Sequence, residues 1–149
     1  MIFTDPPYDK ESLSIYADLA KMANRVLKDG GSLVTYISQY ALPDILDQIR
    51  SNGNGLHYWW EVCLALQARH WQRQGVVKSK GLLWFVKGNK RQLPDYLSDL
   101  VSSQRADKIL HEWQQGSAEA DHVIKILTVV PNCHPRPFPG CRDHCSKRY

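Results

Sequence analysis

Apolar residues recur at helical spacing in three stretches of the chain. The first follows Ser12, which can cap a helix, and stops at Gly30-Gly31. A second helix is predicted from Pro43, a favourable first-turn residue, to Asn52-Gly53. A third begins at Ser117. The inward positions are Leu13, Tyr16, Ala17, Ala20, Ala23 and Leu27 in the first helix, Ile45, Leu46 and Ile49 in the second, and Ala120, Val123, Ile124 and Leu127 in the third.

Short continuous apolar runs between these helices predict strands. They are Met1–Thr4, Ser32–Ile37, Leu56–Leu66 and Gly81–Val86. We expect a basic loop between the last two strands and a short helix at Pro94–Val101. Strands that alternate with helices predict an α/β domain with a mostly parallel sheet. Ligands of such sheets bind at the carboxyl ends of strands, where Asp5–Tyr8 follows the first strand.

Composition and charge narrow the class of protein. The chain has 149 residues, 43% of them hydrophobic and 23% charged, which fits one globular domain. No apolar run is long enough for a membrane helix, and Asp5 and two prolines near the amino end argue against a signal peptide. We therefore expect a cytoplasmic protein.

The net charge of +4 is unevenly spread. No acidic residue lies between Glu61 and Asp95, and this interval holds seven cations: Arg69, Arg73, Lys78, Lys80, Lys87, Lys90 and Arg91. One basic segment on an otherwise acidic chain suggests a polyanionic partner. On charge alone, a solvated loop is the preferred interpretation.

Asp5-Pro6-Pro7-Tyr8 is the sharpest chemical signal. Two prolines stiffen the turn, and the Asp5 carboxylate and the Pro6 carbonyl can both accept hydrogen bonds from an exocyclic amino group. Two acceptors would restore the lone pair of that nitrogen, which the aromatic ring otherwise delocalises. Tyr8 offers a flat face for a stacked base. For four residues alone, an ordinary proline turn is a strong alternative.

The context of this turn resembles the DNA amino-methyltransferases. Asp5–Tyr8 closely resembles their motif IV, and Leu27-Lys28-Asp29-Gly30-Gly31 followed by Ser32-Leu33-Val34 resembles the helix end and strand that come after it. Leu82–Gly88 and His111-Glu112-Trp113-Gln114-Gln115 also resemble elements of the family. The resemblance covers about residues 1–130 by pattern. It implies a partial Rossmann-like fold of the kind found in methyltransferases that depend on S-adenosylmethionine (SAM).

The resemblance also implies roles for individual residues. Asp5 and Pro6 would hold the amino group of a flipped base, Pro7 would shape the turn, and Tyr8 would stack on the base. The Asp form of the motif is more typical of adenine than of cytosine enzymes. The basic segment, about residues 67–91, lies where one branch of the family places target recognition. Candidate phosphate contacts to double-stranded DNA are Arg69, Arg73, Lys78 and Lys80. Tyr58, Trp59, Trp60 and Trp71 are either stacking groups or core residues.

The tail after Val130 departs from the family. A glycine-rich cofactor motif, roughly D-P-F-x-G-S/A-G-T-T, should follow the His111 element, but the chain has a tail rich in Cys, His and Pro. Shifting the reading frame of Pro135–Cys145 by one nucleotide, with suitable synonymous codons, gives L-D-P-F-L-G-A-G-T-T-A. Our hypothesis is that the gene carries a frameshift near Val130 and that residues 131–149 form an aberrant, irregular tail.

A zinc site is the rival interpretation of this tail. Its candidate ligands are Cys133, His134, Cys141, His144 and Cys145. Their spacing does not match paired C-x2-C knuckles, so we expect no metal. A disulfide is less favoured still in a cytoplasmic protein, and we expect Cys63 to be a buried core thiol.

The sequence therefore predicts residues 1–130 to be the target-base half of a methyltransferase. The enzyme would methylate an exocyclic amino group of DNA, with adenine favoured, in a restriction-modification, phage or plasmid context. Without the glycine motif we expect weak or absent activity. The alternative is a DNA-binding remnant without catalysis. The sequence leaves open the recognition sequence, the cofactor-binding residues and the oligomeric state.

Overall fold

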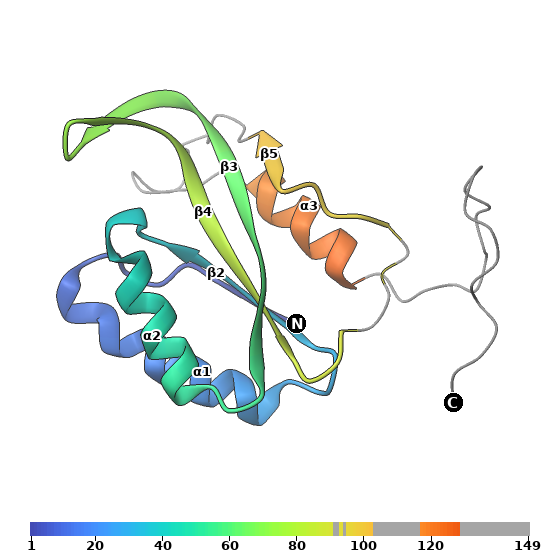
Figure 1. Cartoon of the computed structure of the whole chain (residues 1–149). Coiled ribbons are helices and arrows are strands. Elements are labelled where there is room, and N and C mark those ends of the chain that lie inside the picture. Colours follow the sequence, from blue (N-terminus) through green and yellow to red (C-terminus); the bar gives the residue numbers. More distant parts are fainter. Residues whose placement is uncertain (91–92, 94, 103–116, 129–149) are drawn as a thin grey trace.

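The structure is a computed structural model that describes residues 1–90, 93, 95–102 and 117–128, and the side chains of 10, 67–70, 72 and 117–119 lie outside the description. The strands are β1 (Ile2–Thr4), β2 (Ser32–Ile37), β3 (Leu56–Gln72), β4 (Gly75–Lys87) and β5 (Leu100–Ser102). The helices are α1 (Leu13–Val26), α2 (Leu42–Asn52) and α3 (Ser117–Thr128), with short 3-10 helices η1 (Lys10–Ser12) and η2 (Gln39–Ala41). Figure 1 labels the helices α1, α2 and α3 and the strands β2, β3, β4 and β5.

The five strands form one sheet in the order β1-β2-β4-β3-β5. Strand β1 is parallel to β2, and β3 is parallel to β5, while β4 is antiparallel to both of its neighbours. Because β2 and β3 both oppose β4, all strands except β4 run in the same direction. This confirms the mostly parallel α/β sheet, with one antiparallel strand inserted into it.

Helices cover both faces of the sheet (Figure 1). Helices α1 and α2 pack on one face, against a core that includes Leu33 and Phe85. Helix α3 packs on the other face through Val123 and Leu127. Strand β2 is buried at every position, as expected for a strand covered on both sides. The sheet therefore separates two apolar clusters. A functional site is left to the edges of the sheet and the ends of its strands.

The three helices predicted from apolar periodicity are confirmed as α1, α2 and α3, with one local difference in α1. Ser12 directly precedes α1, but its side chain makes no capping hydrogen bond. Instead the backbone N–H of Ser12 donates to Asp9 Oδ1 at 2.8 Å. Hydrogen bonding from the Ser12 side chain and, to a smaller extent, from this backbone N–H lowers the pKa of Asp9. An aspartate one turn earlier therefore stabilises the start of this helical segment.

Two expectations are wrong. The basic segment is not a loop: β3 and β4 continue through it as a long antiparallel hairpin that turns at Arg73 and Gln74. Pro94–Val101 is not a helix in its described residues, because 95–99 are irregular and Leu100 begins β5, which pairs with Cys63–Ala65 of β3. Pairing with the edge of β3 satisfies the backbone N–H and C=O groups of β5 better than one isolated helical turn would.

Candidate functional site

The Asp5–Tyr8 turn lies at the carboxyl end of β1, as predicted. Asp5 and Pro7 are exposed, Pro6 is buried and Tyr8 is half-buried. The hydroxyl of Tyr8 donates to the carboxylate of Asp5, and the carbonyl of Tyr8 accepts from the hydroxyl of Tyr40 in η2. Hydrogen bonds therefore link two residues of the turn to each other and link the turn to the segment that follows β2.

The β3–β4 hairpin brings two cations to this turn. Lys80 Nζ lies 4.7 Å from the centroid of the Tyr8 ring and 4.9 Å from that of Tyr36. The guanidinium carbon of Arg73 lies 5.6 Å from the centroid of the Tyr40 ring. An ammonium or guanidinium group at this distance from a ring is attracted by the negative face of its π-system. Sequence reasoning nominated both cations but did not reveal that they meet the motif.

The other basic residues of the segment differ in their surroundings. Lys78 is exposed on β4. Lys87 turns inward and donates to the carbonyl of Leu27, at 2.8 Å, at the end of α1. Lys90 Nζ lies 3.2 Å from Ser32 Oγ, and burial lowers its pKa. These two lysines therefore serve the fold. Arg69 lies on β3 among the side chains outside the description, and Arg91 is itself outside it.

The aromatic residues of β3 are exposed rather than buried in the core. Tyr58, Trp59 and Trp60 are 50%, 46% and 55% exposed, and Trp71 is 75% exposed. A register shift between Tyr58 and Trp60 interrupts the regular alternation of the ladder with β4. Large exposed rings are more typical of binding surfaces than of a sheet that only serves the fold. Tyr58 and Trp59 also contact the buried rings of Phe85 and Trp84, with centroids 5.9 Å and 6.2 Å apart. These two residues therefore pack partly on the core, and the stacking interpretation remains for the exposed faces.

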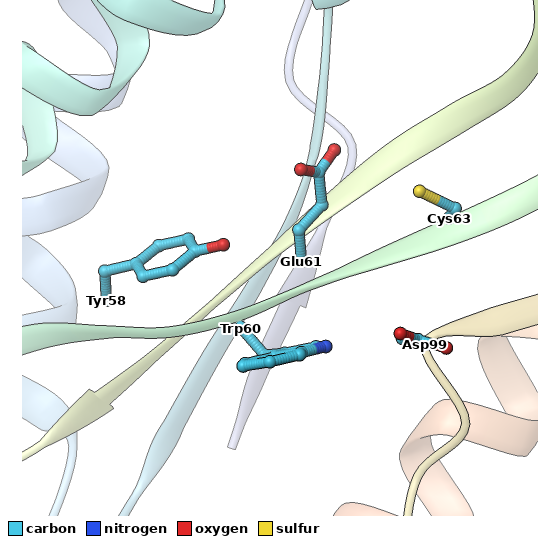
Figure 2. A pocket seen from close by; sticks show the side chains of 5 residues that line it. All are labelled: Tyr58, Trp60, Glu61, Cys63 and Asp99. Carbon is cyan, nitrogen blue, oxygen red and sulfur yellow. The ribbon is translucent and has the colours of Figure 1, made fainter.

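A cavity of about 270 Å³ lies beside β3. It is lined by Tyr58, Trp60, Glu61, Cys63 and Asp99. Figure 2 shows Tyr58, Glu61 and Cys63 on one side of the β3 ribbon and Trp60 and Asp99 on the other. Sequence reasoning missed this cavity, because Asp99 reaches β3 only through the pairing of β5.

Cys63 is half-buried at this cavity and not in the core, which corrects our expectation. Its backbone N–H donates to the carbonyl of Asp99 at 2.7 Å. Burial raises the pKa of the Cys63 thiol, and the nearby carboxylates of Glu61 and Asp99 raise it further. A thiol that stays protonated is a poor nucleophile, so the cavity does not look like a covalent catalytic site.

Metal and membrane features are absent from the described part of the chain. No three His, Cys, Asp or Glu side chains gather there as metal ligands, and none of its helices is long and apolar enough to cross a membrane. The candidate zinc ligands Cys133, His134, Cys141, His144 and Cys145, and the His111–Gln115 element, lie outside the described residues.

No family model and no curated protein matches this sequence. Solved structures that share its fold include two of M1.HpyAVI. The crystal structure of the M1.HpyAVI–SAM complex superimposes with a TM-score of 0.63 at 20% identity, over 84% of this chain and 64% of that one. A crystal structure of M1.HpyAVI gives 0.60 at 17% identity, over 86% of this chain and 62% of that one. This chain thus spans less than two thirds of each neighbour. The likeness confirms the predicted partial Rossmann-like methyltransferase fold.

Proposed function

We propose that this chain is the target-base half of a DNA amino-methyltransferase that acts on a flipped base, with adenine favoured. One observation carries the proposal: the Asp5–Tyr8 turn at the end of β1 is contacted by Lys80 and linked through Tyr40 to Arg73 of a basic hairpin. The turn that would hold a base therefore lies next to the cations that would attract phosphate. The sequence resemblance and the shared fold with M1.HpyAVI point to the same class.

In this proposal the turn holds the target amino group. The Asp5 carboxylate already accepts from the Tyr8 hydroxyl, but a carboxylate has about four lone-pair sites, so it can also accept from an amino group. The carbonyl of Pro6 supplies the second acceptor, and the ring of Tyr8 stacks on the base. Pro7 keeps the turn rigid. Such positioning increases the nucleophilicity of the amino nitrogen.

The hairpin would contact double-stranded DNA. We propose Arg69, Arg73, Lys78 and Lys80 as phosphate contacts, because cations on one projecting element can follow a strand of the duplex. The exposed rings of Trp59 and Trp71 could stack on bases or sugars beside them. Binding that weakens steeply with salt is the expected signature.

SAM would be the methyl donor in this class, and M1.HpyAVI was solved with SAM. The described residues do not fit this cofactor. The segments that join β1 to α1 and β2 to α2 contain no glycine, so neither forms the glycine-rich loop that lets the backbone approach a nucleotide cofactor. We therefore derive no step through SAM and expect the chain alone to have weak or absent activity.

The second candidate function is a DNA-binding remnant without catalysis, and the missing glycine loop favours it. Calorimetric titration with SAM distinguishes the two. Binding heat would support the enzyme, whereas no heat together with salt-dependent DNA affinity would support the remnant. If the chain binds neither SAM nor DNA, both proposals fail. Cooperative thermal unfolding of the same sample shows whether it was folded.

The coding sequence tests the frameshift hypothesis directly. We expect the shifted frame beyond Val130 to encode L-D-P-F-L-G-A-G-T-T-A. If it does, a chain with the restored frame should transfer methyl groups from labelled SAM to DNA, and Asp5→Ala should abolish the transfer. Lys78→Ala, which alters an exposed cation, is the matched control and should mainly weaken binding. A shifted frame without the motif refutes the hypothesis.

A further inference from the structure

Lys80 contacts two tyrosine rings and differs in this from Lys78 on the same strand. It is half-buried, and its ammonium lies 4.7 Å from the Tyr8 ring centroid and 4.9 Å from the Tyr36 ring centroid. Lys78 lies two residues earlier on the same strand and is exposed. The two lysines therefore have the same charge and lie on the same strand but have different surroundings.

Two hydrogen bonds of Tyr8 fix atoms that do not define the plane of its ring, which also packs against the apolar cluster on this face of the sheet. Its hydroxyl donates to Asp5, and its carbonyl accepts from Tyr40. The hydroxyl oxygen lies on the Cγ–Cζ axis of the ring, so rotation about that axis keeps the oxygen in place. The plane of the ring is therefore set by whatever contacts its faces. A cation favours the face over the edge, because the quadrupole of the ring is negative there.

Tyr36 gives Lys80 a fixed support. Tyr36 is 3% exposed, and its ring makes an edge-to-face contact with Phe3 of β1, with the centroids 5.7 Å apart. Its carbonyl accepts from the Tyr16 hydroxyl at 3.2 Å. The ammonium of Lys80 thus connects a ring fixed in the sheet to the ring of the candidate base site.

We propose that Lys80 is a positioning residue that sets the plane of the Tyr8 ring, so that an extruded base finds a preformed stacking face. This inference rests on the proposed function for the identity of the base. It deepens that function, because it gives Lys80 a role that a phosphate contact alone would not have. It also makes the placement of the β3–β4 hairpin part of base recognition.

The first test needs no ligand. Fluorotyrosine is incorporated into the chain, and the ¹⁹F resonance of Tyr8 is identified by its loss in Tyr8→Phe. We expect Lys80→Met, which keeps the stem and removes the charge, to shift this resonance. Lys80→Arg should largely preserve it, and the matched control Lys78→Met should leave it unchanged. An unchanged Tyr8 resonance in Lys80→Met overturns the proposal, whatever the chain binds.

The second test uses a single-stranded oligonucleotide that carries 2-aminopurine, an adenine analogue whose fluorescence falls on stacking and which needs no extrusion from a duplex. Lys78→Met should weaken affinity but keep the quenching at saturation. Lys80→Met should reduce that saturating quench by roughly twofold or more, because the stacking face is no longer held. Lys80→Arg should restore it.

The outcomes separate the two proposals. If Lys80→Met and Lys78→Met behave alike, with weaker binding and full quenching at saturation, Lys80 is only a phosphate contact and the inference fails. If the unmodified chain neither binds the oligonucleotide nor quenches it, the proposed function fails. The ¹⁹F comparison still decides whether Lys80 sets the Tyr8 ring.

Discussion

The guanidinium carbon of Arg73 lies 5.6 Å from the centroid of the Tyr40 ring, and the hydroxyl of Tyr40 donates to the carbonyl of Tyr8. A residue of the hairpin turn thus reaches the candidate base site through a single intermediate side chain. Arg73 occupies this position with a φ of 45°, in the left-handed region. The contact joins three segments that are far apart in the sequence: the turn after β1, the segment after β2, and the hairpin.

Gln74, beside Arg73, should be replaceable with a gain in stability. Its φ is 63°, and two consecutive positive φ values are typical of the tight hairpin turns that favour Asn-Gly. Gln74→Gly should raise the free energy of unfolding by about 0.5–1 kcal/mol, because glycine adopts this conformation without strain. Urea denaturation measures the change, and Gln74→Ala should show no such gain. A destabilised Gln74→Gly variant would contradict this account of the turn.

Lys87 and Lys78 should separate stability from DNA binding. The ammonium of Lys87 donates to the carbonyls of Asn24 and Leu27 at the end of α1, where a cation also complements the helix dipole. Lys87→Met should therefore cost about 1–2 kcal/mol of stability and leave the salt dependence of DNA affinity unchanged.

Lys78→Met should do the opposite. Stability should change by less than about 0.5 kcal/mol, because the residue is exposed. The slope of log affinity against log salt should fall by about 0.9 if Lys78 contacts one phosphate. Denaturation and filter-binding experiments on both variants give the full comparison. If the two substitutions changed the salt slope equally, the assignment of Lys87 to stability and of Lys78 to DNA binding would be wrong.

Sequence patterns predicted α1, α2, α3 and strand β2 because burial dominates there. The apolar period of α1 and the continuous run of β2 reflect tertiary packing directly. The Asp5–Tyr8 turn was predicted for a different reason, since the fixed φ and the missing N–H groups of two prolines end a strand.

The hairpin was missed because its outer half lies beyond the core. From Gly75 to Lys78 the strand is mostly exposed, and the pairing of β3 with β4 is maintained by backbone hydrogen bonds that leave no apolar pattern. The contacts of Lys80 and Arg73 with tyrosine rings depend on how far that hairpin extends. Strand β5 was mistaken for a helix because three residues at a sheet edge carry too little pattern to identify.

Gly81 on β4 should be sensitive to an added methyl group. A Cβ at this position would lie 2.8 Å from Glu61 Oε1 and 3.0 Å from Ile37 Cδ1. The half-buried Glu61 carboxylate can move, but Ile37 is 1% exposed and has little room. Gly81→Ala should therefore cost about 1–2 kcal/mol.

A double-mutant cycle with Ile37→Val checks the cause of that loss. Valine lacks the Cδ1 atom, so Gly81→Ala should cost less in the Ile37→Val background than in the unmodified chain. The coupling should be at least about 0.5 kcal/mol, which is typical of residues in contact. Strictly additive effects in urea denaturation would assign the steric conflict to Glu61 Oε1 or to Ile37 Cγ1, which would lie 3.1 Å from the added Cβ and which valine keeps.

Tyr16 should make stability depend on alkaline pH. Burial, with a further contribution from the negative charge of Asp5, raises the pKa of Tyr16 from 10.0 to about 12. The folded state therefore keeps its phenol proton in a range where the unfolded state loses it. Because the unfolded state binds fewer protons there, the free energy of unfolding must fall as pH rises through this range.

The unmodified chain should lose about 1.4 kcal/mol more stability than Tyr16→Phe between pH 9 and pH 11, since each unit of pKa difference is worth about 1.4 kcal/mol. Phenylalanine keeps the buried ring but has no proton to lose. It also lacks the hydrogen bond to the Tyr36 carbonyl, so its stability should start about 1 kcal/mol lower. Urea denaturation of both proteins across this range measures the difference. Parallel pH profiles would show that the Tyr16 hydroxyl is not isolated from solvent in the folded chain.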